Sequence, residues 1–364
     1  MYTDMINHIT DSNACFLLGA GASRCADKPL MGELTQLVKK DLDSKPGELL
    51  SDLIGENERD ATIEDLLNHL LQLQKLLKAR RTIKVFDFEL QDVEKWIRDI
   101  QESIAKHIGG DWTHSDIHMR FFRRLAKHST KITRDVFTLN YDNVIEATLE
   151  VCRLPYTDGF RGANNAYFDM DLYTSSSTYG TFFNLYKLHG SINWYRDSEG
   201  HVRRKNVVNE GEPVMVYPAE QKYIQTQYGV YETLLTLFRD RLRATKHNNK
   251  LIVCGYSFGD EHINNAIVDG ILSRDSNLTV WAFVGADDNN IDKQILDFEN
   301  RIAACDDRLN VVIGNKECIG KGFESSSAAE LAELKALDLW KFENLVDMIA
   351  NTDEQRNTKS RPCN

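Results

Sequence analysis

The chain has 364 residues, long for one compact domain and short for three, so we expect one large domain with an added module. Apolar residues make up 42% and charged residues 27%, which predicts a globular protein with a sizeable core. The formal net charge of -11 argues against duplex DNA as the main partner, because DNA-binding proteins usually present net basic surface. Local basic patches, such as Arg203, Arg204 and Lys205, remain open as nucleic-acid contacts.

Targeting and metal-binding signals are missing from the sequence. No stretch approaches the roughly 20 apolar residues of a membrane helix. The polar segment Met1–Ser12 lacks the basic start and apolar run of a secretory signal, so we expect a cytoplasmic protein that binds no membrane. The seven cysteines are scattered, with no C-x-x-C spacing, which predicts free thiols and no zinc or other metal site.

The first predicted strand, Ala14–Leu18, stops at the glycine-rich turn Gly19–Ser23. A helix is expected from about Leu30 to Leu42. A block of helices follows, which we interpret as an inserted helical module, about residues 44–128, that packs on the core and covers a pocket. Its helices start at Thr62, which with Asp65 resembles a capping box, and then cover about Val85–Ile108, ending at Gly109, and Ser115–Lys127.

Strands and helices then alternate. The predicted strands are Asp135–Leu139, Leu185–Leu188, Pro213–Tyr217, Leu251–Cys254, Leu278–Val284 and Asn310–Ile313, and the predicted helices include Tyr231–Arg243 and Asp292–Ala304. This alternation predicts an α/β fold with a Rossmann-like, doubly wound, mostly parallel sheet. Residues 157–184 are rich in Gly, Ser, Thr, Asn and Tyr, and we interpret them as a long loop.

The composition shifts to Ala, Leu, Glu and Lys near the C-terminus. Residues 326–350 predict a helical segment, one amphipathic helix or two over Ala328–Ile349, and residues 351–364 predict a flexible tail. The apolar residues of this segment either form an assembly surface or cover the core; they are Leu331, Leu334, Trp340, Leu345 and Ile349.

Four strand ends carry glycine or polar clusters. The turn Gly19–Ser23 follows a strand, as a phosphate-binding turn does, but Arg24 occupies the last position of the G-x-G-x-x-G fingerprint, and a plain tight turn explains it equally well. In Thr138–Asp142, Asn140 or Asp142 is either a site residue or a cap of the following helix.

The other two clusters are equally ambiguous when taken singly. His189-Gly190 follows the strand that ends at Leu188, and a lone histidine is often structural. Gly255–Gly259 forms another small-residue turn, and Asp260 after it reads simply as a helix N-cap. Because the carboxyl ends of parallel strands meet at one edge of a sheet, the four clusters are expected to line one crevice.

These segments, in this order, resemble the sirtuin (silent information regulator-like) family over roughly residues 14–290. The matches are the G-A-G-x-S turn Gly19–Ser23, the T-x-N-x-D segment Thr138–Asp142, the H-G pair His189-Gly190 and the G-x-S turn Gly255–Ser257. The forms N-Y-D, L-H-G and G-Y-S-F-G-D are most similar to the bacterial sirtuin-like NAD hydrolases of antiphage defence. The resemblance implies an NAD-binding catalytic domain over residues 1–325.

The resemblance also implies a role for each matched residue. Gly19, Ala20, Gly21 and Ser23 would hold the pyrophosphate, and Gly255, Ser257 and Phe258 the adenosine side. Catalysis would fall to Asn140, His189 and Asp142. Asn140 would position the attacking water, since its amide both donates and accepts, His189 would accept a proton, and Asp142 would stabilise positive charge or orient its neighbours.

The implied function is an NAD glycohydrolase that cleaves the nicotinamide–ribose bond of NAD, its substrate, to give ADP-ribose and nicotinamide. NAD depletion would then act in antiphage defence by abortive infection. Constant hydrolysis would kill the host, so gating by a homo-oligomer or by a HerA-type hexameric ATPase partner is expected from the same resemblance.

Two alternatives stay open. An NAD-dependent protein deacylase is disfavoured because the four zinc cysteines are missing, Val216–Glu220 replaces the acyl-lysine segment and Leu139 replaces a glutamine. The second alternative is an NAD or ADP-ribose sensor, or an assembly scaffold, without turnover, because a shared fold does not guarantee shared chemistry.

Overall fold

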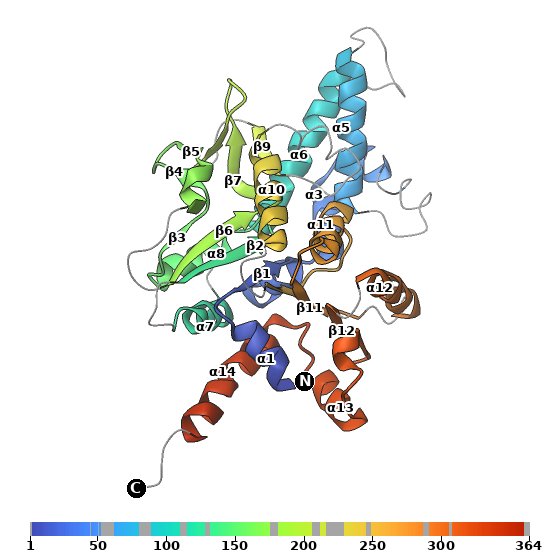
Figure 1. The fold of residues 1–364 in the computed structure, drawn as a ribbon. Helices are drawn as coiled ribbons and strands as arrows, with labels where there is room; N and C mark the ends of the chain where they lie inside the picture. Colours follow the sequence, from blue (N-terminus) through green and yellow to red (C-terminus); the bar gives the residue numbers. More distant parts are fainter. Residues whose placement is uncertain are drawn as a thin grey trace.

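An eight-stranded sheet forms the centre of the molecule (Figure 1). The computed structural model describes residues 2–43, 45–49, 51, 62–79, 89–109, 115–127, 132–174, 181–205, 212–215, 229–244, 249–286, 291–305 and 308–359. In spatial order the strands of this sheet are β13 (Glu317–Ile319), β12 (Leu309–Ile313), β11 (Thr279–Val284), β10 (Lys250–Cys254), β1 (Ala14–Leu18), β2 (Ile132–Thr138), β6 (Thr181–Lys187) and β3 (Tyr156–Thr157).

Neighbouring strands pair in parallel throughout this sheet, except β12 with β13. Every residue of β1, β10 and β12 is buried, as expected for parallel strands that are covered on both faces. The predicted α/β fold with a doubly wound parallel sheet is therefore confirmed.

Helices cover the two faces of the sheet. On one face, packed around Leu17, lie α10 (Val230–Arg243), α11 (Glu261–Leu272) and α12 (Ile291–Cys305). On the other face, around Phe16, lie α1 (Tyr2–Thr10), α7 (Asp116–Leu125), α8 (Val144–Val151), α13 (Ala328–Ala336) and α14 (Phe342–Lys359). The sequence did not indicate α1, whose short apolar face becomes informative only once it packs on the sheet.

A separate hydrophobic core holds the helical module together. Its helices are α3 (Met31–Asp41), α5 (Ile63–Ala79) and α6 (Leu90–Ile108), and α5 and α6 project side by side from the body (Figure 1). The capping box is present, with Thr62 N–H donating to Asp65 Oδ2 (2.8 Å) and Asp65 N–H to Thr62 Oγ1 (3.4 Å). The predicted helix start at Val85 lies outside the described residues, and α7 packs on the sheet rather than on this module.

A second, antiparallel sheet was not predicted. Its order is β4 (Phe160–Arg161), β5 (Ala166–Phe168), β8 (Val202–Arg204), β7 (Gly190–Arg196) and β9 (Glu212–Met215). The interpretation of residues 157–184 as a long loop is wrong, because β4, β5, the 3-10 helix η2 (Met170–Thr174) and the start of β6 fall within it. Strands of two or three residues carry no detectable period, and they form here because Phe160 packs on Trp194 in the core.

The C-terminal segment forms two helices, which resolves one open alternative. Leu334, Leu345 and Ile349 are buried against the sheet, and Leu331 and Trp340 are partly buried there. These side chains therefore cover the core of their own chain. Helix α14 continues to Lys359, past the expected boundary at residue 350.

Candidate active site

A cavity of about 270 Å³ lies at the carboxyl ends of β1, β2, β6 and β10. In the sheet Leu18 pairs with both Thr138 and Cys254, and Thr138 pairs with Lys187, so the four following loops leave the sheet at one edge. Strand order reverses at β1, and ligands of open α/β sheets bind at such switch points. The helical module contributes further walls, including Met31 and Ile108.

Two glycine-rich turns contact each other directly at this edge. Gly19 N–H donates to Cys254 O (3.0 Å), and Gly21 N–H donates to Gly255 O (2.9 Å). A Cβ on Gly19 would lie 2.4 Å from Gly255 O, and a Cβ on Gly255, whose φ is +70°, would lie 2.3 Å from Ala22 N. Glycine is required here because one backbone lies against the other.

Most of the predicted binding residues line the cavity. They are Gly19, Ala20, Ser23, Gly255 and Ser257. Gly21 is not among the lining residues and lies against Gly255 instead. Phe258 also lies off the cavity, where its ring packs on Phe298 at 5.0 Å between centroids.

Asn140 connects the end of β2 to the turn after β1. Its Nδ2 donates to Gly19 O (3.0 Å) and to Ser23 Oγ (2.8 Å). Its Oδ1 is buried and has no hydrogen-bond partner within the described part of the chain. The side chain lines the cavity, so the amide is held at its nitrogen and keeps a carbonyl acceptor available at the site.

His189 and Asp260 form a buried pair on the same cavity. His189 Nε2 lies 2.9 Å from Asp260 Oδ2, and both residues are at most 5% exposed. The other carboxylate oxygen of Asp260 accepts from His262 N–H (2.9 Å) at the start of α11. Asp260 is therefore both the helix cap that the sequence predicted and the partner that orients the imidazole.

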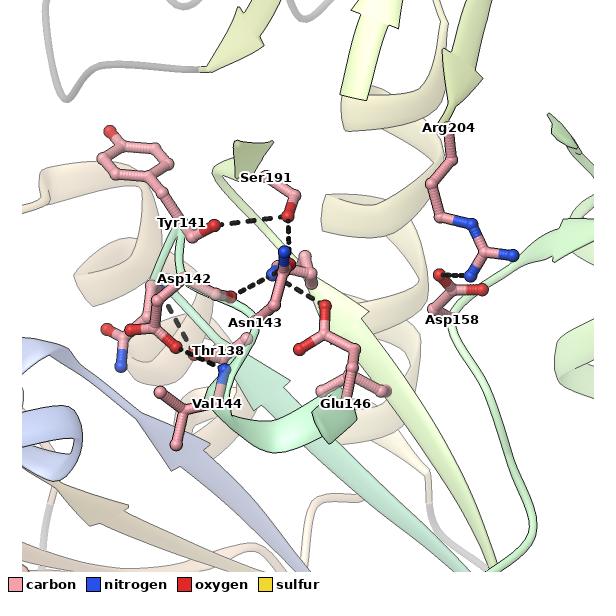
Figure 2. A network of polar contacts seen from close by, with 12 residues as sticks. Thr138, Tyr141, Asp142, Asn143, Val144, Glu146, Asp158, Ser191 and Arg204 are labelled. Carbon is pink, nitrogen blue, oxygen red and sulfur yellow. Dashed lines mark hydrogen bonds and ion pairs between the residues drawn. The ribbon is translucent and has the colours of Figure 1, made fainter. Parts of the chain in front are cut away.

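Asp142 also lines the cavity, and its carboxylate has a structural contact as well. Its Oδ1 accepts from Val144 N–H (3.0 Å), the first residue of α8, although the N-cap position of that helix is Asn143 (Figure 2). Both interpretations of Asp142 therefore remain compatible with its position.

A buried lysine at the end of β6 contacts the loop between β2 and α8. Lys187 Nζ donates to Asp142 O, to Asn143 Oδ1 (3.3 Å) and to Glu146 Oε1 (2.8 Å). Figure 2 shows Asn143 also joined to Ser191, whose Oγ donates to Asn143 Oδ1 at 3.0 Å. Burial raises the pKa of the Glu146 carboxyl, and the Lys187 charge opposes that rise.

Carboxylates dominate the charged groups on the cavity wall. Glu64, Asp65, Asp142 and Asp260 line it, and among the described lining residues Lys28 carries the one ammonium group. Lys28 Nζ donates to Gly109 O (2.8 Å), which ties it to the end of α6. Such a wall favours a reacting centre that develops positive charge.

Sequence reasoning missed several lining residues. Asp260 was identified only as a cap, and Tyr141, Tyr256 and Glu64 were not identified at all. The sequence could have indicated Tyr141, since it lies between two predicted site residues. No sequence pattern indicates Glu64, because only the packing of the helical module brings it to the edge of the sheet.

Two of the three residues in the basic run pair with carboxylates. Arg203 Nε contacts Asp197 Oδ2 (2.9 Å), Arg204 Nη1 contacts Asp158 Oδ2 (2.5 Å; Figure 2), and Lys205 lies over the Tyr195 ring. The two ion pairs reduce the positive charge that this run could offer to a nucleic acid.

The described ranges contain no group of three His, Cys, Asp or Glu residues arranged to hold a metal ion. Over the same ranges, no helix has the length and apolar character needed to cross a bilayer. The six cysteines in this part of the chain are free: Cys15, Cys25, Cys152, Cys254, Cys305 and Cys318.

Comparison with known proteins connects this site to a family. Residues 134–304 match the family model described as a SIR2-like domain. None of the curated proteins matches the chain. Among solved structures, it is similar to one titled "Structural Basis for the Mechanism and Regulation of Sir2 Enzymes", at 12% identity and a TM-score of 0.41, covering 97% of this chain and 98% of that one.

The matched segment contains three of the four strand ends that form the cavity. It includes Asn140, Asp142, His189 and the turn from Gly255, and it begins after the turn Gly19–Ser23. This part of the chain is thus similar to a SIR2-like domain, and the similarity includes three of the four loops that line the cavity.

Proposed function

We propose that the protein is an NAD glycohydrolase that uses Asn140 and His189 to cleave the nicotinamide–ribose bond. The observation that carries this proposal is the placement of Asn140, with its unused Oδ1, and of the His189–Asp260 pair on one cavity at the switch point of the sheet. The similarity of residues 134–304 to a SIR2-like domain supports NAD as the substrate.

The proposed reaction is hydrolysis of the bond between C1′ of the ribose and the nicotinamide nitrogen. The C1′–N bond breaks with both electrons passing to nicotinamide, which leaves as a neutral molecule and needs no general acid. A water oxygen bonds to C1′ and loses one proton, giving ADP-ribose, nicotinamide and H⁺. The transition state resembles a ribosyl oxocarbenium ion, as in glycoside cleavage.

We assign each side chain a part in this reaction. Asn140 Oδ1 accepts from the attacking water, because its Nδ2 is already bound by Gly19 and Ser23. His189 takes the released proton, and the Asp260 carboxylate orients the ring and stabilises the imidazolium. Asp142 and its acidic neighbours stabilise the developing positive charge.

The substrate cradle is assigned to the two interlocked turns. Gly19, Ala20 and Ser23 hold the pyrophosphate, and Gly255 and Ser257 the adenosine side. Gly21 and Phe258 do not line the cavity. They support the two turns through their contacts with Gly255 and Phe298.

We further propose the biological setting implied by the sequence motifs: cytoplasmic NAD depletion in antiphage defence, by abortive infection. Activity would be gated by self-assembly or by a HerA-type hexameric ATPase. Light scattering of the purified chain tests the first route, because a strict monomer at micromolar concentration excludes constitutive self-assembly. An NAD hydrolysis assay with and without a purified HerA-type hexameric ATPase tests the second.

The Asn140→Ala and His189→Ala variants test the reacting centre. Each is expected to lower nicotinamide release by at least about two orders of magnitude, the usual contribution of a positioned base or water-orienting group. Liquid chromatography of nicotinamide and ADP-ribose measures the rate. Asn184→Ala, a buried asparagine on β6, and His107→Ala, beside Asp41, serve as matched controls and should stay within about twofold.

Near-normal rates in both folded variants would contradict these assignments. Tight nucleotide binding by the wild type without turnover, even with the ATPase present, would favour the sensor or scaffold. Nicotinamide release that depends on an acylated lysine peptide would favour the deacylase.

A further inference from the structure

We propose that Tyr141 and Glu64 form a positioning pair through which the helical module sets the geometry of the catalytic loop. This inference rests on the proposed NAD hydrolysis. It gives the module a role in the reaction beyond covering the cavity.

Tyr141 joins three parts of the molecule. It lies between Asn140 and Asp142, the two loop residues that line the cavity. Its carbonyl oxygen accepts from Ser191 Oγ (3.2 Å; Figure 2) and from Ile192 N–H (3.0 Å), which anchors the loop to the strand that follows His189. Movement of Tyr141 would therefore displace both halves of the reacting centre.

The side chain of Tyr141 belongs to the helical module. Its ring is buried in the module's own core, with Leu34, Leu67 and Trp96 among the members of that cluster. Its hydroxyl donates to Glu64 Oε1 at 3.1 Å, and Glu64 is only 8% exposed. A charge-assisted hydrogen bond between buried groups is both stronger and more directional than a neutral one.

Glu64 is well placed to act as a fixed point. It lies in the first turn of α5, directly inside the Thr62–Asp65 capping box. The adjacent Ile63 N–H donates to Thr35 Oγ1 (3.0 Å), which ties this turn to α3. The position of the Glu64 carboxylate is thus set by two helices of the module.

The consequence for catalysis follows from the tolerance of reaction geometry. A displacement of about 1 Å at a reacting group can cost about 100-fold in rate. Releasing the Tyr141 hydroxyl should therefore lower kcat more than it raises KM, because it disturbs the loop that carries Asn140 and Asp142.

The test is a double-mutant cycle on nicotinamide release with thermal unfolding recorded for every variant. Tyr141→Phe and Glu64→Ala should each lower kcat by about 10-fold, with KM changed by less than about twofold. The double variant should be no slower than the slower single variant, because both remove one interaction. Glu64→Gln should lose less kcat than Glu64→Ala, because its amide oxygen still accepts the hydrogen bond although its charge on the cavity wall is removed.

Tyr156→Phe is the matched control. Tyr156 hydroxyl donates to Glu150 Oε1 (2.9 Å), the same chemistry at a site away from the cavity, so its loss should leave kcat unchanged. Additive losses in the cycle, or an unchanged kcat in Tyr141→Phe, would overturn the pair. A wild type that releases no nicotinamide, alone or with the ATPase, would instead overturn the proposed function itself.

Discussion

At the scale of single residues, the glycines of the two turns show how local chemistry builds the site. Gly19 and Gly21 lie against Gly255, with backbone atoms where side chains would otherwise stand. The turns can then present Ala20, Ser23 and Ser257 to the cavity.

Replacing Gly255 tests this contact. Gly255→Ala should destabilise the protein by about 2–4 kcal/mol, because the new Cβ would lie 2.3 Å from Ala22 N at a φ of +70°. Urea denaturation measures the change. Gly259→Ala is the control on the same turn, where a Cβ would meet only Ser257 Oγ at 3.7 Å, and its cost should be under about 1 kcal/mol. Equal effects of the two substitutions would contradict the account of Gly255.

At the scale of elements, the buried pair between β6 and α8 holds the loop that carries Asp142. Lys187 is fully buried and Glu146 is 4% exposed. A buried charge pair of this kind is costly to form, yet breaking it leaves one charge uncompensated.

The pair predicts unequal effects of single and double substitutions. Lys187→Met should cost about 3–5 kcal/mol, because it leaves the Glu146 carboxylate buried alone, and adding Glu146→Leu should recover a large part of that loss. Lys95→Met is the control, since Lys95 and Asp43 are exposed and contact each other at 2.9 Å; its loss should leave the free energy of unfolding nearly unchanged. Equilibrium unfolding in urea measures the free energies. A double variant as unstable as Lys187→Met would contradict the prediction that the unpaired Glu146 charge causes the loss.

At the scale of the whole molecule, the buried His118, which packs against helix α14, makes the stability of the fold depend on pH. It is 1% exposed, its ring lies 4.8 Å from that of Phe342 in α14, and burial lowers its pKa to about 4. The unfolded chain restores a value near about 6.5, so unfolding takes up a proton below that pH.

This depressed pKa predicts the acid sensitivity of the fold. The contribution of His118 is complete above about pH 6.5 and is lost as the pH falls through about 4, a change of up to about 3 kcal/mol in the free energy of unfolding. His118→Leu should flatten the stability curve in that window. Urea titrations from pH 4 to 7 provide the measurement, and parallel curves for wild type and His118→Leu would contradict the prediction.

The sequence determined the α/β class, the central strands and the capping box at Thr62, because apolar runs and caps are local signals. It also placed Asn140 and His189 at strand ends, which the parallel register brings to one edge. The pairing of His189 with Asp260, 71 residues apart, and the approach of Glu64 to Tyr141 depend on tertiary packing. The second sheet likewise forms only because its short strands pack on the core. Local pattern specifies which elements form, whereas contacts between distant segments decide which side chains meet.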